Sequence, residues 1–358
     1  MMEKIRLDEL CDINMGQSPD SNSYNQEKDG LPFFQGNADF GELYPTTRMW
    51  CNKPLKVVEK DTLLISVRAP IGALNFATEK CCIGRGLAGI KPKEEVNLKY
   101  IFYCLKYKKV ELNNKGTGST FKAIAKTALG EIKIKALPKQ EQDYHSEVLD
   151  KVSNIIAQRK EQLILLDDLI KSRFVEMFGD PVHNPLGWNI KPFLECGSCK
   201  NGMNFGTGET GVELQYLGVG DFKNLTKIEE VTKLGQVCLN KMPSEDYMLK
   251  NGDIIFVRSN GNKALVGRCL AIYPNGIPTT YSGFCIRYRK TDESLEIPYL
   301  LQVLKTESMR LMMAGRGANI QNLNQQILGQ LQIPIPPNNL QREFGQFIEQ
   351  VDKLKVAY

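Results

Sequence analysis

Two copies of one residue pattern occupy the two halves of this 358-residue chain. Residues 116–142 read GTGSTFKAIAKTALGEIKIKALPKQEQ, and they align without a gap to residues 315–341, which read GRGANIQNLNQQILGQLQIPIPPNNLQ. A repeat constrains the fold more than any single motif, because each copy must form the same structural unit. The matched pairs are Gly116 and Gly315, Gly118 and Gly317, Gly130 and Gly329, Ile132 and Leu331, Ile134 and Ile333, Pro138 and Pro337, and Gln142 and Gln341.

Two further blocks match in the same order along the chain. FFQGNADF, ending at Phe40, resembles QYLGVGDF, ending at Phe222. EKDTLLISVR, ending at Arg68, resembles KNGDIIFVR, ending at Arg258. Three ordered matches predict a duplicated domain, and the chain length suits two domains of about 150 residues each with connecting elements.

Each copy carries the same mixture of strand and helix signals. TLLISV and DIIFV are short β-branched runs bounded by turn residues, which predicts buried strands, and glycine-containing loops follow them at 68–72 and 258–267. EIKIKALP and its counterpart QLQIPIPP alternate as strands do, and a proline closes each. Residues 96–107 and 296–313 have helical periodicity, so we predict an α+β fold with two similar mixed α/β domains.

A long helix is expected between the copies, because residues 139–178 contain neither glycine nor proline and carry a heptad pattern of apolar residues. Pro138 suits the helix start, and Gly179-Asp180-Pro181 suits its end. At about 1.5 Å per residue, this helix is roughly 60 Å long. The apolar seam consists of Leu149, Val152, Ile156, Leu163, Leu166, Ile170 and Met177, and Arg159 and Arg173 occupy the remaining seam positions.

The second copy ends in the start of the same helix. Phe344, Ile348, Val351 and Leu354 continue an apolar stripe, over about half the length of the central helix. An amphipathic helix buries its stripe by pairing, so we expect long antiparallel coiled-coil helices between the domains, with self-association or another chain completing the shorter one. The predicted divisions of the chain are 1–137, 138–178, 179–336 and 337–358.

The composition limits the class of protein. The chain has 46 Lys and Arg against 41 Asp and Glu, a mildly basic balance that permits nucleic-acid binding without establishing it. No apolar run approaches the roughly 18 residues that span a membrane, and the N-terminus has no apolar signal core. We therefore expect a cytoplasmic protein with no membrane partner, whose ten scattered cysteines stay reduced.

Motifs for metal binding and catalysis are sparse. Cys196 and Cys199 have metal-ligand spacing, but His145 and His183 stand alone, so we expect no metal site. The sequence contains no GxxxxGK[ST], HExxH or GxSxG motif. FGTG at 205–208 lacks the apolar strand expected just before a cofactor-binding glycine loop. We therefore expect no catalytic residue and no cofactor in this chain.

Polar side chains beside glycines in the duplicated loops are candidates for contacts with double-stranded DNA. Arg can grip guanine edges and Asn or Gln adenine edges, while Lys and Ser bind phosphates. Residues 119–122 and 318–321 align but differ in chemistry, as expected if two similar frames read different half-sites, although neutral drift gives the same divergence. The candidates are Arg48, Arg68, Arg85, Ser119, Thr120, Lys122, Arg258, Asn260, Asn262, Lys263, Arg316, Asn319 and Gln321.

Three segments carry a resemblance to a known family. LLISVRAPIG, CIGRGLAGIKP and the junction FVEMFGDPVHNPLGW at 174–188, together with two variable domains and two helical spacers, resemble the specificity subunit of type I restriction-modification systems. The resemblance spans essentially the whole chain. It implies a non-catalytic subunit in which each target-recognition domain reads one half of a split DNA site, while the helices set the unread gap.

The resemblance also implies partners and cofactors. In that family the helices dock two methyltransferase subunits, which carry S-adenosylmethionine and flip an adenine out of the duplex. Motor-nuclease restriction subunits join them in an ATP-dependent complex. The short distal helix departs from the family pattern, and truncated members of the family pair with each other, so homodimerisation is a further expectation.

Two alternatives from other classes stay open. A self-contained DNA adenine methyltransferase would use FGTG as its cofactor loop and would bind S-adenosylmethionine without a partner. A protein adaptor would use the coiled coil and would not bind DNA. Salt-sensitive binding to duplex DNA distinguishes a DNA-binding chain from such an adaptor, because phosphate contacts release counterions.

Overall fold

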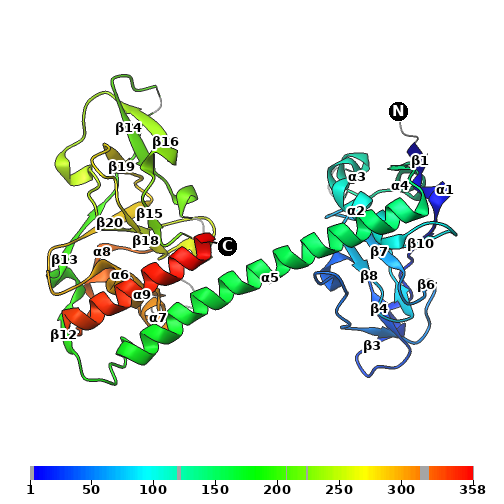
Figure 1. The fold of residues 1–358 in the computed structure, drawn as a ribbon, viewed down its shortest axis with the longest axis horizontal. Coiled ribbons are helices and arrows are strands. Elements are labelled where there is room, and N and C mark those ends of the chain that lie inside the picture. The colour runs from blue at the N-terminus through cyan, green and yellow to red at the C-terminus, as the bar shows by residue number, and fades with distance from the viewer. Residues whose placement is uncertain (1–3, 119–121, 207, 223–224, 315–321, 358) are drawn as a thin grey trace. The chain divides into compact units, whose positions relative to one another are not determined.

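The computed structural model describes residues 4–357 apart from 119–121, 207, 223–224 and 315–321. The chain divides into two compact units, Met1–Gln158 and Arg159–Tyr358, called unit 1 and unit 2 below. The division falls inside helix α5 (Lys139–Phe178), which has the bounds that the heptad pattern predicts (Figure 1). The predicted domain borders at the ends of this helix stay predictions.

Unit 1 contains two main sheets. The four-stranded main sheet is antiparallel, and the five-stranded second sheet contains one parallel pair, β4 with β9. In spatial order, the main sheet consists of β2 (Cys11–Met15), β10 (Leu87–Pro92), β7 (Leu63–Ser66) and β8 (Leu74–Phe76). The second sheet consists of β3 (Tyr24–Asn25), β5 (Trp50–Cys51), β4 (Leu31–Phe34), β9 (Cys81–Ile83) and β6 (Val57–Val58).

Short helices complete unit 1, and a terminal strand pair lies just before α5. Strand β1 (Lys4–Arg6) pairs with β11 (Lys133–Lys135), so the start of the chain joins the segment that leads into α5. The core lies between the main sheet and the helices, with Leu63, Ile65 and Ile101 fully buried. The helices are α1 (Leu7–Leu10), α2 (Leu98–Tyr107), α3 (Lys109–Lys115) and α4 (Lys126–Gly130).

Unit 2 repeats this plan. Its main sheet has the same strand order with one added strand, and its second sheet again contains a parallel pair, β14 with β19. The main sheet consists of β13 (Gly197–Asn201), β20 (Cys285–Lys290), β17 (Asp253–Val257), β18 (Cys269–Ile272) and β15 (Lys227–Ile228). The second sheet consists of β16 (Gly235–Leu239), β14 (Val212–Leu217) and β19 (Thr279–Tyr281), and β12 (Asn189–Pro192) pairs with β21 (Gln332–Ile335).

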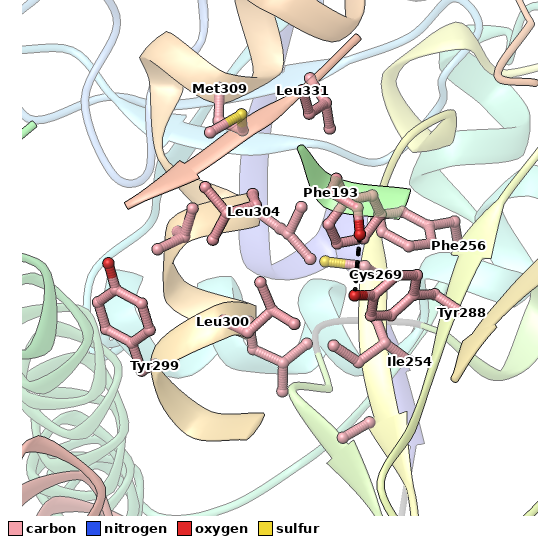
Figure 2. Close-up of a cluster of buried hydrophobic side chains, with 14 of the residues drawn as sticks. Phe193, Ile254, Phe256, Cys269, Tyr288, Tyr299, Leu300, Leu304, Met309 and Leu331 are labelled. Atoms are coloured by element: carbon pink, nitrogen blue, oxygen red, sulfur yellow. Dashed lines mark hydrogen bonds between the residues drawn. The ribbon is translucent and has the colours of Figure 1, made fainter. Parts of the chain in front are cut away.

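Aromatic and aliphatic side chains together form the core of unit 2 (Figure 2). Phe193 stacks on Tyr288 with ring centroids 4.0 Å apart, and the Tyr288 hydroxyl donates a 3.1 Å hydrogen bond to the Phe193 carbonyl. The buried phenol therefore has a partner, as burial of a polar group requires. The helices of this unit are α6 (Ile297–Lys305), α7 (Glu307–Ala314), α8 (Gln325–Gly329) and α9 (Asn338–Ala357).

The helix predicted over 296–313 is in fact two helices. Thr306 separates α6 from α7 because its backbone is extended, with φ −61° and ψ 149°. Its hydroxyl donates to the Val303 carbonyl at 2.8 Å. Threonine side chains often end helices by such local hydrogen bonds, which the apolar periodicity of the segment does not reveal.

Hydrogen bonds at matched positions confirm the predicted duplication. The Tyr100 hydroxyl donates to the Lys135 carbonyl at 2.9 Å, and the Tyr299 hydroxyl donates to the Pro334 carbonyl at 2.9 Å. Each tyrosine thereby ties the helix that follows the main sheet to the strand that precedes the long or distal helix. The two units share these buried contacts as well as their strand order.

One detail of the predicted alignment is wrong. Arg68 follows the last ladder residue of its strand, Ser66, by two positions, whereas Arg258 directly follows the last ladder residue Val257. Both ladder residues pair with the first residue of the neighbouring strand, so they are equivalent. The two arginines are therefore offset by one residue, and side chains one residue apart in an extended segment point in opposite directions.

Helix α9 packs against the C-terminal part of α5 within unit 2 (Figure 1). Arg173 pairs with Glu343 at 3.0 Å, and Asp167 pairs with Lys355 at 2.7 Å. The partner number in α9 rises as the number in α5 falls, so the two helices run antiparallel. None of the helices in the described ranges has the length and apolarity needed to cross a membrane.

The predicted seam divides into a buried part and an exposed part. Leu166, Ile170, Met177, Ile348 and Val351 belong to or pack against the core of unit 2. The N-terminal seam residues are exposed by 39% to 50%, and we call them the α5 stripe. The α5 stripe consists of Leu149, Val152, Ile156 and Leu163.

Candidate nucleic-acid interface

In each unit several chain segments meet where the strands of the main sheet end, and we call this region the strand-end edge. In unit 1 the backbone N–H of Gly16, just after β2, donates to the Leu87 carbonyl at 2.9 Å. The N–H of Val67, just after β7, donates to the Gly86 carbonyl at 2.9 Å. The edge therefore includes the ends of β2 and β7 and the turn between β9 and β10.

Three predicted DNA-contacting cations lie on this edge of unit 1. Arg68, Arg85 and Lys122 are all exposed, and they come from three different segments. The Ala69 N–H donates to the Lys122 carbonyl at 3.0 Å, which places Lys122 beside the segment after β7. The Arg85 N–H donates to Ser18 Oγ at 3.2 Å, so the backbone of this turn is held in place. This edge therefore carries three positively charged side chains from three separate segments.

Arg48 is also exposed, but it belongs to the loop before β5 of the second sheet. In the described ranges, no hydrogen bond or ion pair joins Arg48 to the three cations of the edge. Glycines make the edge itself compact, because a Cβ on Gly16 would overlap the Gly84 carbonyl and a Cβ on Gly86 would overlap the Gln35 carbonyl. Only glycine permits this close approach of backbone segments.

The equivalent edge of unit 2 uses the same backbone pattern. The Gly202 N–H donates to the Cys285 carbonyl at 3.0 Å. The Arg258 N–H donates to the Phe284 carbonyl at 2.8 Å, and the Arg258 carbonyl accepts from the Leu323 N–H at 2.9 Å. Arg258 is half-buried at this edge. It is the predicted cation that the structure places there.

The asparagines after β17 are used to shape the turn. The Asn260 side-chain oxygen accepts from the Asn262 N–H at 2.7 Å, and the Asn262 side-chain oxygen accepts from the Ala264 N–H at 3.1 Å. Each side chain is thereby held against its own turn through one lone pair of its amide oxygen, and its contact with a base stays a prediction. The exposed Lys263 begins the 3₁₀ turn η7 (Lys263–Leu265) that Asn262 caps.

Five predicted contacts lie outside the described residues, so the structure does not place them. They are Ser119, Thr120, Arg316, Asn319 and Gln321.

Sequence reasoning missed two exposed side chains at the edge of unit 2. The Phe284 side chain lies in the turn between β19 and β20, and 59% of its surface is exposed. Asn204 is also exposed, and a Cβ on Gly283 would overlap its amide oxygen. GRG at 84–86 and SGF at 282–284 both precede the first residue of the matched strands β10 and β20, and this equivalence becomes visible only from the strand bounds.

The described residues contain no group of three His, Cys, Asp or Glu side chains that could hold a metal ion. Burial raises the pKa of the Cys199 thiol to about 12, and burial also raises the pKa of Cys196, so both stay protonated near neutral pH. The Glu209 carboxylate accepts from the Gly206 N–H at 3.0 Å, where a glycine loop would hold a phosphate. The next described element is strand β14, whereas a phosphate-binding loop leads into a helix.

A family model for the type I restriction modification DNA specificity domain matches residues 1–165 and 213–357. The chain belongs to this family. Among named relatives, the MjaX specificity subunit of Methanocaldococcus jannaschii is 50% identical over 152 residues, which is 42% of this chain and 36% of that protein. The MjaVIII specificity subunit of the same organism is 25% identical over 326 residues, covering 85% of this chain and 75% of that protein.

Solved structures of specificity subunits are also similar. The S subunit of M. genitalium is 16% identical and has a TM-score of 0.59, covering all of this chain and 91% of that one, which shows that the fold is shared. The HsdS subunit of Thermoanaerobacter tengcongensis is 45% identical, with a TM-score of 0.41, over 44% of this chain and 38% of that one. The matches span 36% of the MjaX subunit and 52% of the MjaIX subunit, so only part of each relative is represented.

Proposed function

We propose that this chain is the DNA sequence-specificity subunit of a type I restriction-modification complex. The observation that carries the proposal is the family match in both units, combined with two equivalent strand-end edges that present different side chains. A duplicated frame with different exposed chemistry suits a bipartite target, because each half-site is read by its own edge. The chain acts by recognition, and methylation and cleavage belong to its partners.

In unit 1 we assign DNA contact to Arg68, Arg85 and Lys122, which share one edge. Arg85 projects from a turn between glycines, so a guanidinium at this point can approach a guanine edge closely. Lys122 lies on the loop beside Arg68 and suits a phosphate, since lysine is a flexible point charge. In unit 2 we assign base contact to Arg258 at the strand-end edge, and phosphate contact to Lys263 on the 3₁₀ turn η7 that follows β17. The candidate contacts outside the described residues belong to the same proposal.

We assign partner docking to α5 and α9. The α5 stripe leaves four large apolar side chains exposed at heptad spacing, which suits pairing with a partner helix. Along the other part of α5, a cavity of about 1060 Å³ in unit 2 is lined by α5, α6, α7 and α9, including Ile170, Phe174 and Ile348. We propose that methyltransferase subunits dock on these helices and that restriction subunits join through them, with self-association as a further use of the coiled coil.

S-adenosylmethionine and ATP belong to those partners in this proposal. The occupied backbone at Gly206 argues against a phosphate or cofactor loop at 205–208. Calorimetry with the purified chain and S-adenosylmethionine checks this assignment, and we expect no heat of binding.

Methylome sequencing tests the function as a whole. A host without other adenine methyltransferases would express this chain together with type I methyltransferase subunits. We expect N6-methyladenine at one bipartite motif with an unread gap. Methylation at one continuous motif, or no methylation, would refute the proposed function.

A further inference from the structure

Phe284 is an exception among the phenylalanines that the structure describes. Of the phenylalanines that the structure describes, it is the only one in the exposed class, whereas the others are buried or half-buried. Its neighbours on either side of the turn, Tyr281 and Cys285, are fully buried. The phenyl ring therefore projects to solvent from a turn whose flanking strands are part of the core.

The backbone of this turn is held firmly. The Phe284 N–H donates to Ser282 Oγ at 3.2 Å. The Phe284 carbonyl accepts from the Arg258 N–H at 2.8 Å and from the Ser259 N–H at 3.4 Å. A side chain on a fixed backbone loses little conformational entropy when it binds, which is the property of a good contact residue.

The duplication allows the position of Phe284 in unit 2 to be compared with the equivalent position in unit 1. In unit 1 the Gly86 carbonyl accepts from Val67, as the Phe284 carbonyl accepts from Arg258, so Phe284 stands where unit 1 has Gly86. The exposed side chain of that turn in unit 1 is Arg85, one residue earlier. One scaffold thus presents a guanidinium in unit 1 and a phenyl ring in unit 2, at the edge assigned to DNA.

We infer that Phe284 reads a thymine by apolar contact with its 5-methyl group in the half-site of unit 2. The inference rests on the proposed function. The thymine methyl is the apolar group that base pairs present in the major groove, and phenylalanine is among the side chains that contact it. Polar neighbours at the same edge, Arg258 and the exposed Asn204, supply the hydrogen-bonding groups that a ring lacks.

Uracil substitution tests this contact, because uracil pairs as thymine does but lacks the methyl. Once methylome sequencing has given the motif, each thymine of the unit 2 half-site is replaced in turn by uracil in a synthetic duplex. Binding is measured with the complex of this chain and methyltransferase subunits. We expect one replacement to weaken binding by about fourfold, the effect of one buried methyl group.

Phe284→Ala should bind the thymine and uracil duplexes equally at that position, and Phe284→Leu should retain part of the difference. Ile190→Ala is the matched control, because Ile190 is also exposed but lies on β12, which precedes the opposite end of β13. This control should keep the full difference. Thermal unfolding checks that each variant is folded. If Phe284→Ala does not fold, the uracil effect of Phe284→Leu is compared with that of wild type instead.

Three results would overturn the inference. They are a half-site of unit 2 without thymine, no effect of any uracil, and equal uracil effects in wild type and Phe284→Ala. If the third result comes with a uniform loss of affinity in Phe284→Ala, the ring is assigned to base stacking instead. All three results leave the bipartite motif intact, whereas failure of the proposed function is seen earlier, as the absence of such a motif in wild type.

Discussion

The side-chain oxygen of Gln341 accepts a 2.9 Å hydrogen bond from the backbone N–H of Glu296, just before helix α6 begins. In unit 1 the side-chain oxygen of Gln142 accepts a 2.9 Å bond from the Asn97 N–H, just before α2. Both glutamines lie in the first turn of the long or distal helix and are buried. Each therefore fixes the start of one helix against the start of another, by the same contact.

Replacing Gln341 by methionine should destabilise unit 2 while nearly keeping the volume. The Gln341 amide also donates to the Pro336 carbonyl at 2.7 Å and to the Ser294 carbonyl at 2.9 Å. The change therefore removes the side-chain partner of three backbone groups, in one buried and two part-buried hydrogen bonds. We expect a loss of about 2 to 4 kcal/mol in the free energy of unfolding. Urea unfolding followed by Trp188 fluorescence in a Trp50→Phe background measures it.

Gln142→Met is the matched control in unit 1. The chain has only two tryptophans, and Trp50 lies in unit 1 while Trp188 lies in unit 2. Gln142→Met should shift the Trp50 transition measured in a Trp188→Phe background, and it should leave the Trp188 transition measured in the Trp50→Phe background in place. Equal shifts of both transitions in either variant would contradict a local effect.

Acid should weaken unit 2 through Asp292. A hydrogen bond from Lys191, 2.6 Å away, and bonds from the side chain and backbone of Ser294 hold the pKa of Asp292 well below its usual range. The unfolded chain, with a pKa near about 3.9, therefore binds this proton more readily than the folded chain. The stabilisation is complete above about pH 4 and is lost as the pH falls below it.

Asp292→Asn removes this dependence. The deficit in its free energy of unfolding against wild type should be largest at pH 6. It should shrink as the pH falls below about 4, because the unfolded wild-type chain then binds the Asp292 proton while the folded chain does not. Trp188 fluorescence in urea at each pH measures the deficit. Asp246→Asn removes an exposed carboxylate 3.4 Å from Lys200 and is the charge control. A deficit that stays constant with pH would show that Asp292 does not supply the effect.

The three cations of the unit 1 edge should contribute to DNA binding in different ways. Arg85→Ala should cost about 1 to 3 kcal/mol and relax the choice of one base pair in the half-site of unit 1. Lys122→Ala should weaken binding to all DNA sequences. It should also reduce the slope of the logarithm of the binding constant against the logarithm of salt concentration by about 1 in magnitude. Fluorescence anisotropy over a range of salt concentrations measures both. Lys60→Ala, three residues before the opposite end of β7, should change neither, and an equal effect there would argue against the edge.

The α5 stripe should serve partners rather than the fold of this chain. Ile156→Glu should leave the free energy of unfolding within about 0.5 kcal/mol, because half of the Ile156 side chain is exposed. It should weaken binding of methyltransferase subunits at least about tenfold, since it places a charge in the helix seam. Asn154→Glu adds the same charge off the seam and should leave binding unchanged. Co-purification and light scattering measure assembly, and an intact complex with Ile156→Glu would contradict the docking proposal.

Ile170 lies on the same helix as Ile156 but should contribute to folding stability, because it is buried. It is 8% exposed and belongs to the core of unit 2. Ile170→Ala should cost about 2 to 5 kcal/mol of stability, because the cavity that it leaves cannot fill completely. The Trp188 transition measures it.

The sequence predicted the features that depend on local pattern. The heptad run gave α5 its bounds, and the matched pair Gln142 and Gln341 makes matched hydrogen bonds. The predicted buried strands are present as Leu63–Ser66 and Asp253–Val257, where every residue is buried. These features succeed because apolar periodicity and repetition record burial directly.

Features that depend on exact register could not be predicted. The one-residue offset between Arg68 and Arg258 is visible only from the strand ladder. Phe284 is exposed because it lies in a turn, and a phenylalanine in the sequence does not indicate an exposed turn. Asn260 and Asn262 were assigned to bases by residue type alone, which does not reveal that each side-chain oxygen accepts from a backbone N–H group of its own turn. The DNA contacts as a set stay predictions, because no nucleic acid tests them.

At the strand-end edge, glycine backbones keep the turns closed, while neighbouring side chains are exposed for contact with DNA. Gly16, Gly86 and Gly202 hold neighbouring backbones together through main-chain bonds, so these turns do not depend on the exposed side chains of Arg85 and Phe284 for their closure. Substitutions beside these glycines can therefore alter the recognised bases at small cost in folding free energy. A lineage with this architecture can acquire new targets one residue at a time, without passing through unfolded intermediates.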